Sequence, residues 1–321
     1  MKILVTGGAG FIGSHLTDLL LALGHEVHVI DDLSSGNIDN ISHNRSNPNF
    51  HFTADTILNE AVTTELIAEC DHIYHMAAAV GVKLIMNRPV ETLATNVKGT
   101  EMVLSKANQY KKKILIASTS EVYGKLMEEN GKALNEEADR LMGATSKRRW
   151  AYACSKAFDE FLALAYYEEK KLPVVIARLF NTVGSRQSGQ YGMVLPSFVQ
   201  KALIDKPIVI YGHGRQRRSF IDVSDVVAAV IQLMDSDAAV GGVYNIGSQE
   251  EISIEALAHK VKEMTSSASP IEYISYDRAY GSGFEDMQRR LPDTSKINEL
   301  LGFQPKKNLE TIIQSVIDYY T

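Results

Sequence analysis

Cysteine is scarce in this sequence: Cys70 and Cys154 are the only two among 321 residues. Two thiols cannot build a disulfide framework, which favours a reducing, cytoplasmic compartment. No apolar run approaches the roughly 18 residues that a membrane-spanning helix needs, and MKILVTGG shows no cleavable signal pattern. We therefore expect a cytoplasmic protein that works without a membrane.

A basic excess is also missing. The formal net charge is −6, from 33 Lys and Arg against 39 Asp and Glu, which argues against a nucleic-acid partner because phosphate-binding faces are basic. The histidines lack metal-ligand spacing, since His72 and His75 lie three apart in an expected strand and point to opposite faces. We expect neither a nucleic acid nor a metal.

Short apolar runs alternate with helical patterns through the first half of the chain. The expected strands cover 2–6, 26–32, 72–78, 113–119 and 172–180, and one long helical pattern covers 89–110. This alternation is typical of a doubly wound parallel α/β sheet, which binds ligands at the carboxyl ends of its strands. We predict a Rossmann domain over 1–180. A smaller C-terminal α/β substrate-binding lobe is predicted over 181–321, with some segments, 243–248 among them, returning to the first sheet.

A glycine-rich turn follows the first strand. GGAGFIG places Gly7, Gly10 and Gly13 between that strand and a helix, where glycine lets the backbone approach a pyrophosphate. The second strand ends in Asp31 and Asp32, whose carboxylates suit ribose hydroxyls, and no arginine follows to meet a 2′-phosphate. The turn therefore predicts a dinucleotide, and the acids favour NAD over NADP.

Tyr152 and Lys156 lie four residues apart in a second helical pattern, so both face the same side. An ammonium beside a phenol favours the phenolate, which makes the tyrosine a better base. With Thr119 at a strand end upstream, we interpret the three as catalytic. The basic runs KKK (111–113) and KRR (147–149) are expected to be solvated, and Cys154 to be a buried thiol.

Motifs along nearly the whole chain resemble one family. GGAGFIG, HMAAA, TNVKGT, STSEVYG, YACSK, RLFNTVG and YGHGRQRRSFIDVSDV together resemble the extended short-chain dehydrogenases/reductases, the NAD-dependent nucleotide-sugar epimerases and dehydratases. The resemblance implies an enzyme that binds NAD and a nucleotide sugar, UDP-linked in its nearest members. The implied cofactor contacts are Gly7, Gly10, Phe11, Ile12, Gly13, Asp31, Asp32, Asp55, Ala77, Ala78, Asn96, Tyr152 and Lys156.

The resemblance also implies the chemistry. Tyr152 would take a proton from a sugar hydroxyl, usually at C4, while a hydride passes to NAD⁺ and a 4-keto sugar forms. Thr119 would hydrogen-bond the same oxygen, and Lys156 would also hold the nicotinamide ribose. The implied substrate contacts are Asn181, Arg186, Val194, Tyr211 and Arg218.

Ser120 and Glu121 point to a particular reaction. TSEVYG, MGATSKRRWAYACSK (142–156) and AYGSGFEDMQRRLPD (279–293) resemble the UDP-glucuronate decarboxylases. In that chemistry a 4-keto uronate loses CO2, with Ser120 and Glu121 near C5 and Arg218 at the carboxylate or phosphates.

Other interpretations stay open. The loop 185–198 resembles 4-epimerases acting on UDP-glucuronate, UDP-glucose or hexosamines. A 4,6-dehydratase is less favoured because Ser120 replaces the aspartate of the glucose enzymes, and Glu121 could be structural. A protein that senses dinucleotides without catalysis is the non-enzymatic alternative. The apolar stripe Phe158, Phe161, Leu162, Leu164 and Ala165 predicts, by resemblance, a homodimer through this helix.

Overall fold

Seven strands form one parallel sheet in the computed structural model, which describes residues 1–81, 85, 87–125, 133–189, 193–280 and 287–321. The strands are β1 (Lys2–Thr6), β2 (Glu26–Ile30), β3 (Phe50–Thr53), β4 (His72–His75), β5 (Lys113–Thr119), β6 (Val174–Leu179) and β11 (Val243–Ile246). Their order is β11-β6-β5-β4-β1-β2-β3, and all neighbours are parallel. The predicted doubly wound sheet is confirmed, and its order reverses between β1 and β4, where ligands bind in such folds.

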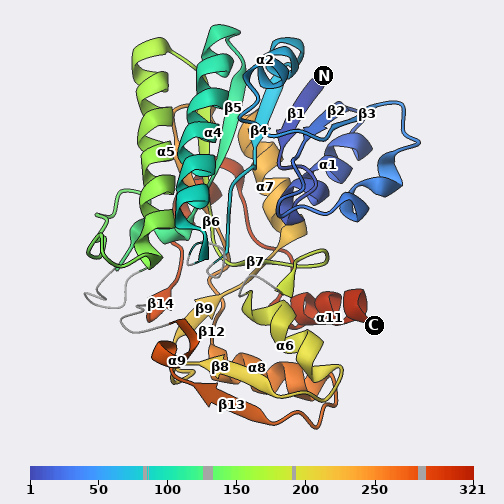
Figure 1. Ribbon diagram of the computed structural model, residues 1–321, viewed down its shortest axis with the longest axis vertical. Helices are drawn as coiled ribbons and strands as arrows, with labels where there is room; N and C mark the ends of the chain where they lie inside the picture. The colour runs from blue at the N-terminus through green and yellow to red at the C-terminus, as the bar shows by residue number, and fades with distance from the viewer. Residues whose placement is uncertain (82–84, 86, 126–132, 190–192, 281–286) are drawn as a thin grey trace.

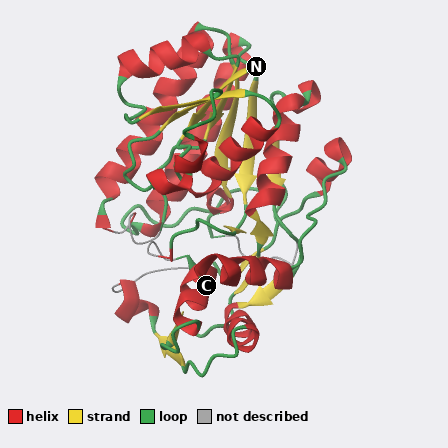
Figure 2. Ribbon diagram, turned by 90° about the vertical axis from the view of Figure 1, so that its right-hand side faces the viewer, coloured by secondary structure: helices red, strands yellow, loops and turns green. Residues whose placement is uncertain are grey.

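Helices cover both faces of the sheet (Figures 1 and 2). One face carries α1 (Phe11–Ala22), α7 (Val223–Asp235) and α10 (Ser295–Leu301), and the other carries α2 (Glu60–Glu69), α4 (Pro89–Gln109) and α5 (Arg149–Lys170). Short 3-10 turns lie at η1 (Ile38–Asn40), η2 (Ser42–Asn44), η3 (Ser120–Tyr123) and η5 (Asp237–Ala239). The seven strands of the main sheet all point their carboxyl ends toward the smaller lobe, which lies below the sheet in Figure 1.

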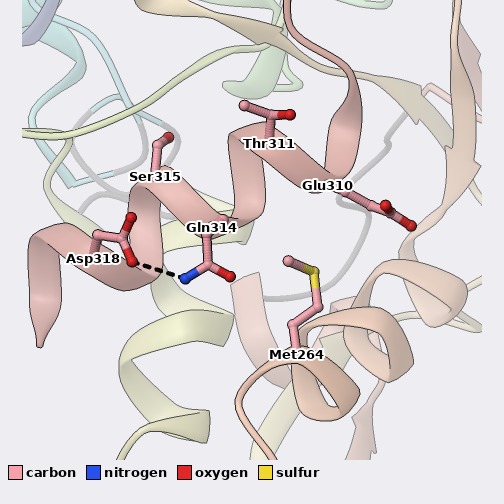
Figure 3. A pocket seen from close by; sticks show the side chains of 6 residues that line it. All are labelled: Met264, Glu310, Thr311, Gln314, Ser315 and Asp318. Carbon is pink, nitrogen blue, oxygen red and sulfur yellow. Dashed lines mark hydrogen bonds between the residues drawn. The ribbon is translucent and has the colours of Figure 1, made fainter.

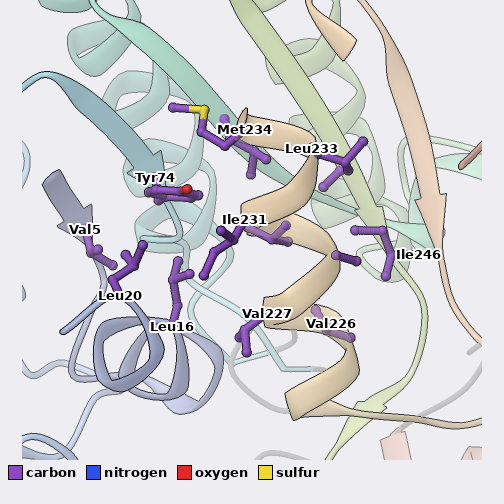
Figure 4. Packing of buried hydrophobic residues seen from close by; sticks show 14 of the residues in the cluster. Val5, Leu16, Leu20, Tyr74, Val226, Val227, Ile231, Leu233, Met234 and Ile246 are labelled. Atoms are coloured by element: carbon purple, nitrogen blue, oxygen red, sulfur yellow. The ribbon is translucent and has the colours of Figure 1, made fainter. Parts of the chain in front are cut away.

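Successive side chains along each strand point to opposite faces of the sheet, so each face packs against its own layer of helices. Val5 and Tyr74 point toward α1 and α7, where they meet Leu16 and Ile231 (Figure 4), whereas Leu4 belongs to the cluster under α2, α4 and α5. Both faces of a parallel sheet are buried, so its strands read as continuous apolar runs. Burying these side chains stabilises the fold by about 25 cal/mol per Å² of apolar surface.

The second half of the chain builds a smaller lobe around its own hydrophobic cluster. This lobe holds α6 (Val194–Ala202), β8 (Ile208–Tyr211), α8 (Ile254–Met264), β13 (Ile271–Ile274), α9 (Tyr276–Tyr280) and α11 (Leu309–Tyr320). Short strands β7 (Thr182–Val183), β9 (Arg217–Ser219), β10 (Ile221–Asp222), β12 (Glu251–Ser253) and β14 (Arg289–Arg290) connect it to the sheet domain. The segment that forms β11 lies in the main sheet beside β6.

A cavity of about 420 Å³ lies between α8 and α11 (Figure 3). Met264, Thr311 and Gln314 line it, and Gln314 donates a hydrogen bond to Asp318. The candidate site residues from the sequence do not line this cavity. Within the described residues, every helix is too short or too polar to cross a bilayer.

Candidate active site

The glycine turn brings β1 and α1 into close contact. Gly7 has a φ of +70°, and a Cβ on it would lie 2.7 Å from the backbone nitrogen of Ala77. Gly10 is the N-cap of α1, and a Cβ on Gly13 would lie 2.2 Å from the carbonyl oxygen of Gly7. The turn therefore requires glycine, and it leaves the first backbone N–H groups of α1, including those of Phe11 and Ile12, beside the turn as an anion-binding end.

Two acids stand beyond the end of β2. Asp31 accepts hydrogen bonds from the backbone of Ala9 at 2.9 Å and Leu33 at 2.8 Å, which fixes it against the glycine turn. Burial raises the pKa of the Asp31 carboxyl, and these backbone donors oppose the shift. Asp32 is exposed and accepts from Ser34. Their place beside the turn fits the ribose contacts predicted from the sequence.

Residues after β3 and β4 lie at the same edge of the sheet as the glycine turn. Asp55 follows β3 and accepts hydrogen bonds from Thr56 and Asn59. Ala77 and Ala78 follow β4, where the backbone of Ala77 donates to Thr6. 

Asn96 connects this strand end to the helices on the other side. Its Oδ1 accepts from the backbone of Ala79 at 2.8 Å, and its Nδ2 donates to Ser155 on α5 at 3.3 Å. The structure thus joins the glycine turn, the β4 loop and α5 around one crevice.

Tyr152 lies where α5 packs along β5 and η3. Its ring is buried, and its phenol forms a hydrogen bond with Thr119 at the end of β5. Burial and the negative charge of Glu121 raise the pKa of the phenol, whereas Thr119 and Arg149 act to lower it. The pair suits a sugar hydroxyl, because Thr119 can bind the oxygen whose proton Tyr152 takes.

Lys156 is buried one turn further along α5. Its Nζ donates to Oδ2 of Asp159 at 2.9 Å, and the side chains are 2% and 0% exposed. The ammonium is therefore held in an ion pair beside Tyr152.

Glu121 is clamped between two arginines. Nη1 of Arg149 lies 2.5 Å from Oε2, and Nη2 of Arg290 lies 2.7 Å from Oε1. Burial opposes ionisation, but the two guanidinium charges outweigh it and hold the pKa of Glu121 far below its usual range. Arg290 also donates to Ser120 at 3.4 Å. Glu121 is therefore an ionised counter-charge at neutral pH rather than a proton donor.

Arg218 and Arg290 meet through strand pairing. β9 and β14 are parallel, with Arg290 aligned opposite Arg218, so the two side chains project to one face. The other face carries Arg289, which binds Glu251 through two contacts of 2.7 Å. Arg218 is buried and donates to the backbone of Arg217. The predicted substrate arginine thus lies beside the Glu121 cluster.

The remaining predicted substrate contacts lie at different depths. Asn181 follows β6 and donates to the backbone of Ser219 at 2.8 Å, which holds it close to β9. Arg186 instead pairs with Asp18 on α1 at 2.7 Å. Val194 begins α6 and Tyr211 ends β8, both in the smaller lobe. Their roles toward a substrate stay predictions.

Two expectations from the sequence are wrong. Arg149 was grouped with a solvated basic run, but it is buried because it begins α5 facing inward and pairs with Glu121. Cys154 is exposed, because it lies on the side of α5 opposite the buried stripe.

Sequence reasoning assigned no role to Arg149, Arg290 or Asp159. Arg149 and Asp159 could have been found from the spacing of Tyr152, Lys156 and their neighbours on α5. Positions 149, 152, 156 and 159 recur every three or four residues and so share one helix face. Arg290 carries no comparable local signal, since strand pairing brings it to the site.

Comparisons with known proteins agree with this geometry. The model of the GDP-mannose 4,6-dehydratase family matches residues 4–316. A UDP-N-acetyl-alpha-D-glucosaminuronate decarboxylase of Bacillus cytotoxicus is 39% identical, over 99% of this chain and 97% of the relative. UDP-glucuronic acid decarboxylase 1 of Danio rerio is 36% identical, over 100% of this chain and 72% of the relative.

One solved structure shows the same fold with ligands. UDP-glucuronic acid 4-epimerase from Bacillus cereus, in complex with UDP-glucuronic acid and NAD, matches with a TM-score of 0.89 and 28% identity. The match covers 100% of this chain and 99% of that one. The chain belongs to this family of extended short-chain dehydrogenases/reductases, NAD-dependent enzymes that modify nucleotide sugars. The predicted family, enzyme class and cofactor are confirmed.

The residues present fit the cofactor. Gly7 and Gly13 allow no Cβ where the turn folds back on β4 and α1, so the backbone can approach a pyrophosphate closely. Asp31 is held by two backbone donors beside the turn, where its carboxylate would meet a ribose of the cofactor. Lys156 and Tyr152 lie on α5 with Ser155, which accepts a hydrogen bond from Asn96, and this side would hold the nicotinamide half.

Proposed function

We propose that the protein decarboxylates a UDP-linked uronate after oxidising its C4 hydroxyl, with UDP-glucuronate the first candidate. The observation that supports this is the buried cluster of Arg149, Glu121 and Arg290 next to Thr119 and Tyr152. Within the described part of the chain, Arg149 and Arg290 both contact the Glu121 carboxylate, and Arg218 lies on the same strand face as Arg290, so positively charged groups gather here. Such a charge suits a substrate that brings its own carboxylate.

Tyr152 and Thr119 have separate roles in the proposed reaction. Tyr152 takes the C4 hydroxyl proton while Thr119 holds that oxygen. Bound NAD supplies the hydride acceptor. The resulting ketone lies β to the carboxylate, so breaking the bond from C5 to the carboxyl carbon releases CO2 and leaves its electron pair as an enolate. Tyr152, now protonated, and Thr119 stabilise the enolate oxygen.

The arginines act on the carboxylate that is attached to C5. Arg290 and Arg218 project to one face and can orient the leaving carboxylate. Glu121 stays ionised beside them, so it balances their charge while Ser120 lies next to C5. Protonation of the enolate at C5 then gives the UDP-4-keto-pentose.

A second uronate is supported by a specific relative. The Bacillus cytotoxicus protein, whose name states a substrate with an N-acetyl group at C2, is 39% identical over nearly the whole chain. A 4-epimerase is the second reaction, supported by the likeness to the Bacillus cereus epimerase. The loop 185–198 that favoured it from sequence lies partly outside the described residues.

The test is to incubate purified protein and NAD⁺ with each UDP-uronate and follow the sugar by proton NMR, with CO2 measured in the headspace. We expect CO2 together with a UDP-pentose, a UDP-4-keto-pentose or the corresponding N-acetylated product. An epimerised uronate without CO2 would replace decarboxylation by epimerisation. Two unchanged uronates would refute the uronate assignment.

Two tyrosine variants distinguish an enzyme from a protein that only senses the dinucleotide. Tyr152→Phe removes the base, so we expect turnover to fall by about 10²–10⁴-fold. Tyr166→Phe changes a half-buried tyrosine on the same helix and should retain activity. If Tyr152→Phe kept full turnover, the catalytic assignment would be wrong.

We also propose that the protein is a homodimer. Phe158 and Phe161 are 48% and 65% exposed on α5, with Cys154 beside them on the same side of the helix. Large apolar side chains that share a helix face are typical of a contact surface. A second copy packing on α5 would cover them.

A further inference from the structure

Asp159 lies beside the catalytic lysine in a site closed to water. Its Oδ2 accepts from Nζ of Lys156 at 2.9 Å, and its side chain is fully buried. Charges in such surroundings are weakly screened and act on neighbouring groups. Asp159 is therefore placed to change what Lys156 does to Tyr152, which lies four residues before the lysine on α5.

Other elements fix the carboxylate. Thr100 on α4 forms a hydrogen bond with Asp159. The hydroxyl of Thr100 also lies 3.1 Å from Nε2 of His75, whose Nδ1 lies 2.8 Å from the hydroxyl of Thr6. Burial and the charge of Lys156 lower the pKa of His75 to about 3. The histidine is therefore neutral, and it brings no second positive charge to the carboxylate.

We propose that Asp159 is a positioning residue that draws the ammonium of Lys156 onto itself and thereby sets the pH at which Tyr152 becomes a base. The inference rests on the proposed role of Tyr152 in C4 oxidation. An ammonium engaged by a carboxylate stabilises a neighbouring phenolate less than a free one does. Asp159 thus keeps Tyr152 protonated to higher pH.

Several charged groups face the phenol from different elements. Asp159 on α5 and Glu121 on η3 raise the pKa of Tyr152, and Arg149 lowers it. Glu121 is itself balanced by Arg149 and Arg290. Asp159 in turn faces Lys156 and Glu160, and burial raises the pKa of its own carboxyl. Among these acids, Asp159 is the one that binds the lysine directly.

A purely structural role makes a different prediction. If Asp159 only compensated a buried lysine, its removal would lower stability and leave the ionisation of Tyr152 unchanged. Asp159→Asn keeps the shape and a hydrogen-bond acceptor for Lys156 but removes the charge. The variant therefore separates an electrostatic effect on the tyrosine from simple support of the helix.

The first measurement is the pH dependence of C4 oxidation in the holoenzyme, followed by the absorbance of reduced nicotinamide in a single turnover. Oxidation needs the phenolate, so the rate falls on the acid side. In Asp159→Asn the acid limb should move to lower pH by about one unit, which is about tenfold in rate below the limb. A limb at the wild-type pH would overturn the proposal.

The second measurement needs no turnover. Protein labelled with carbon-13 at the tyrosine Cζ is titrated with NAD⁺ bound, and the Tyr152 signal is assigned from Tyr152→Phe. Tyr152 should ionise at lower pH in Asp159→Asn than in the wild type, and coincident curves would overturn the proposal even if the sugar assignment failed. Glu168→Gln is the control, because it removes an exposed charge about 24 Å along α5 from Tyr152 and should shift neither curve.

Discussion

Glu121 carries its negative charge at a position with little access to water. Its side chain is 13% exposed and sits between Arg149 and Arg290, which are 4% and 9% exposed. Buried ions are costly unless they are paired, and removing one partner leaves the others uncompensated. The same pairing that shapes the site is therefore also a stability element.

Glu121→Gln should lower the free energy of unfolding by about 3–5 kcal/mol at neutral pH, because two buried arginines lose their counter-charge. The pKa of Glu121 is depressed in the folded state, so this stabilisation is fully present above its ordinary value of 4.5 and is lost progressively as pH falls from there toward the much lower folded-state pKa. Urea unfolding of wild type and variant at neutral pH and near pH 4 measures the loss of unfolding free energy and its dependence on pH. The gap between wild type and variant should narrow in acid.

Glu272→Gln is the control for that change. Glu272 is exposed on β13, so its replacement should leave stability little changed at either pH. A gap between wild type and Glu121→Gln that stayed constant from neutral to acid pH would contradict the depressed pKa.

At the residue scale, the sequence located some members of the site and not others. Thr119, Tyr152 and Lys156 were accessible because each sits in a local pattern, either a strand end or a helical spacing. Arg290 was not, because 169 residues separate it from Glu121 and only the pairing of β14 with β9 brings it there. Short-range patterns predict which face a residue occupies, and distant partners require the fold.

At the scale of single elements, the glycine turn makes the sharpest prediction. A Cβ on Gly13 would lie 2.2 Å from the carbonyl oxygen of Gly7, a backbone atom that cannot move aside without opening the turn. Gly13→Ala should therefore weaken NAD binding by at least about tenfold and destabilise the fold by about 1–3 kcal/mol. Calorimetric titration with NAD⁺ and thermal unfolding measure the two effects.

Gly24→Ala is the matched change at a distance from the crevice. Gly24 has a φ of +83° but open space around it, so alanine adds backbone strain of about 1 kcal/mol without a clash. NAD affinity should stay at the wild-type value. Equal loss of affinity in both variants would mean that stability, rather than the turn, controls binding.

Element ends were harder to predict than elements. The expected strands 26–32 and 72–78 end in the structure at Ile30 and His75. Residues 31–32 and 76–78 make no strand pairing, because the chain turns away from the sheet at the carboxyl ends of β2 and β4. The helix expected over 89–110 agrees with α4 to within one residue, because Pro89 stands in its first turn and its buried positions, from Thr92 to Ala107, follow helical spacing.

At the scale of the whole molecule, the proposed homodimer makes a prediction about the exposed face of α5. Replacing both Phe158 and Phe161 by aspartate puts charge into a surface that the proposed dimer buries, so we expect monomers. Size-exclusion chromatography with light scattering reads the mass. Ile204→Asp, at an apolar residue 59% exposed elsewhere, should keep the dimer, and a wild type that is already monomeric would refute the proposal.

The division of the chain after residue 180 stays a prediction from the sequence. Alternating strands and helices indicated the Rossmann sheet, because each βαβ unit is local. The smaller lobe mixes short strands with helices, and β9 pairs with both β12 and β14 from distant segments. Periodicity holds little information about such pairings, so the place of Arg218 beside Arg290 could not be derived.

The late position of β14 in the chain has a consequence for how the enzyme is made. A ribosome adding about 10–20 residues per second needs roughly ten seconds to proceed from Lys156 to Arg290. During that interval the growing chain already contains the glycine turn and Tyr152, while Arg290, one of the two described ion-pair partners of Glu121, has not yet been added. The glycine turn and Tyr152 are thus synthesised early, but the cluster around Glu121 is completed only after Arg290 has been added.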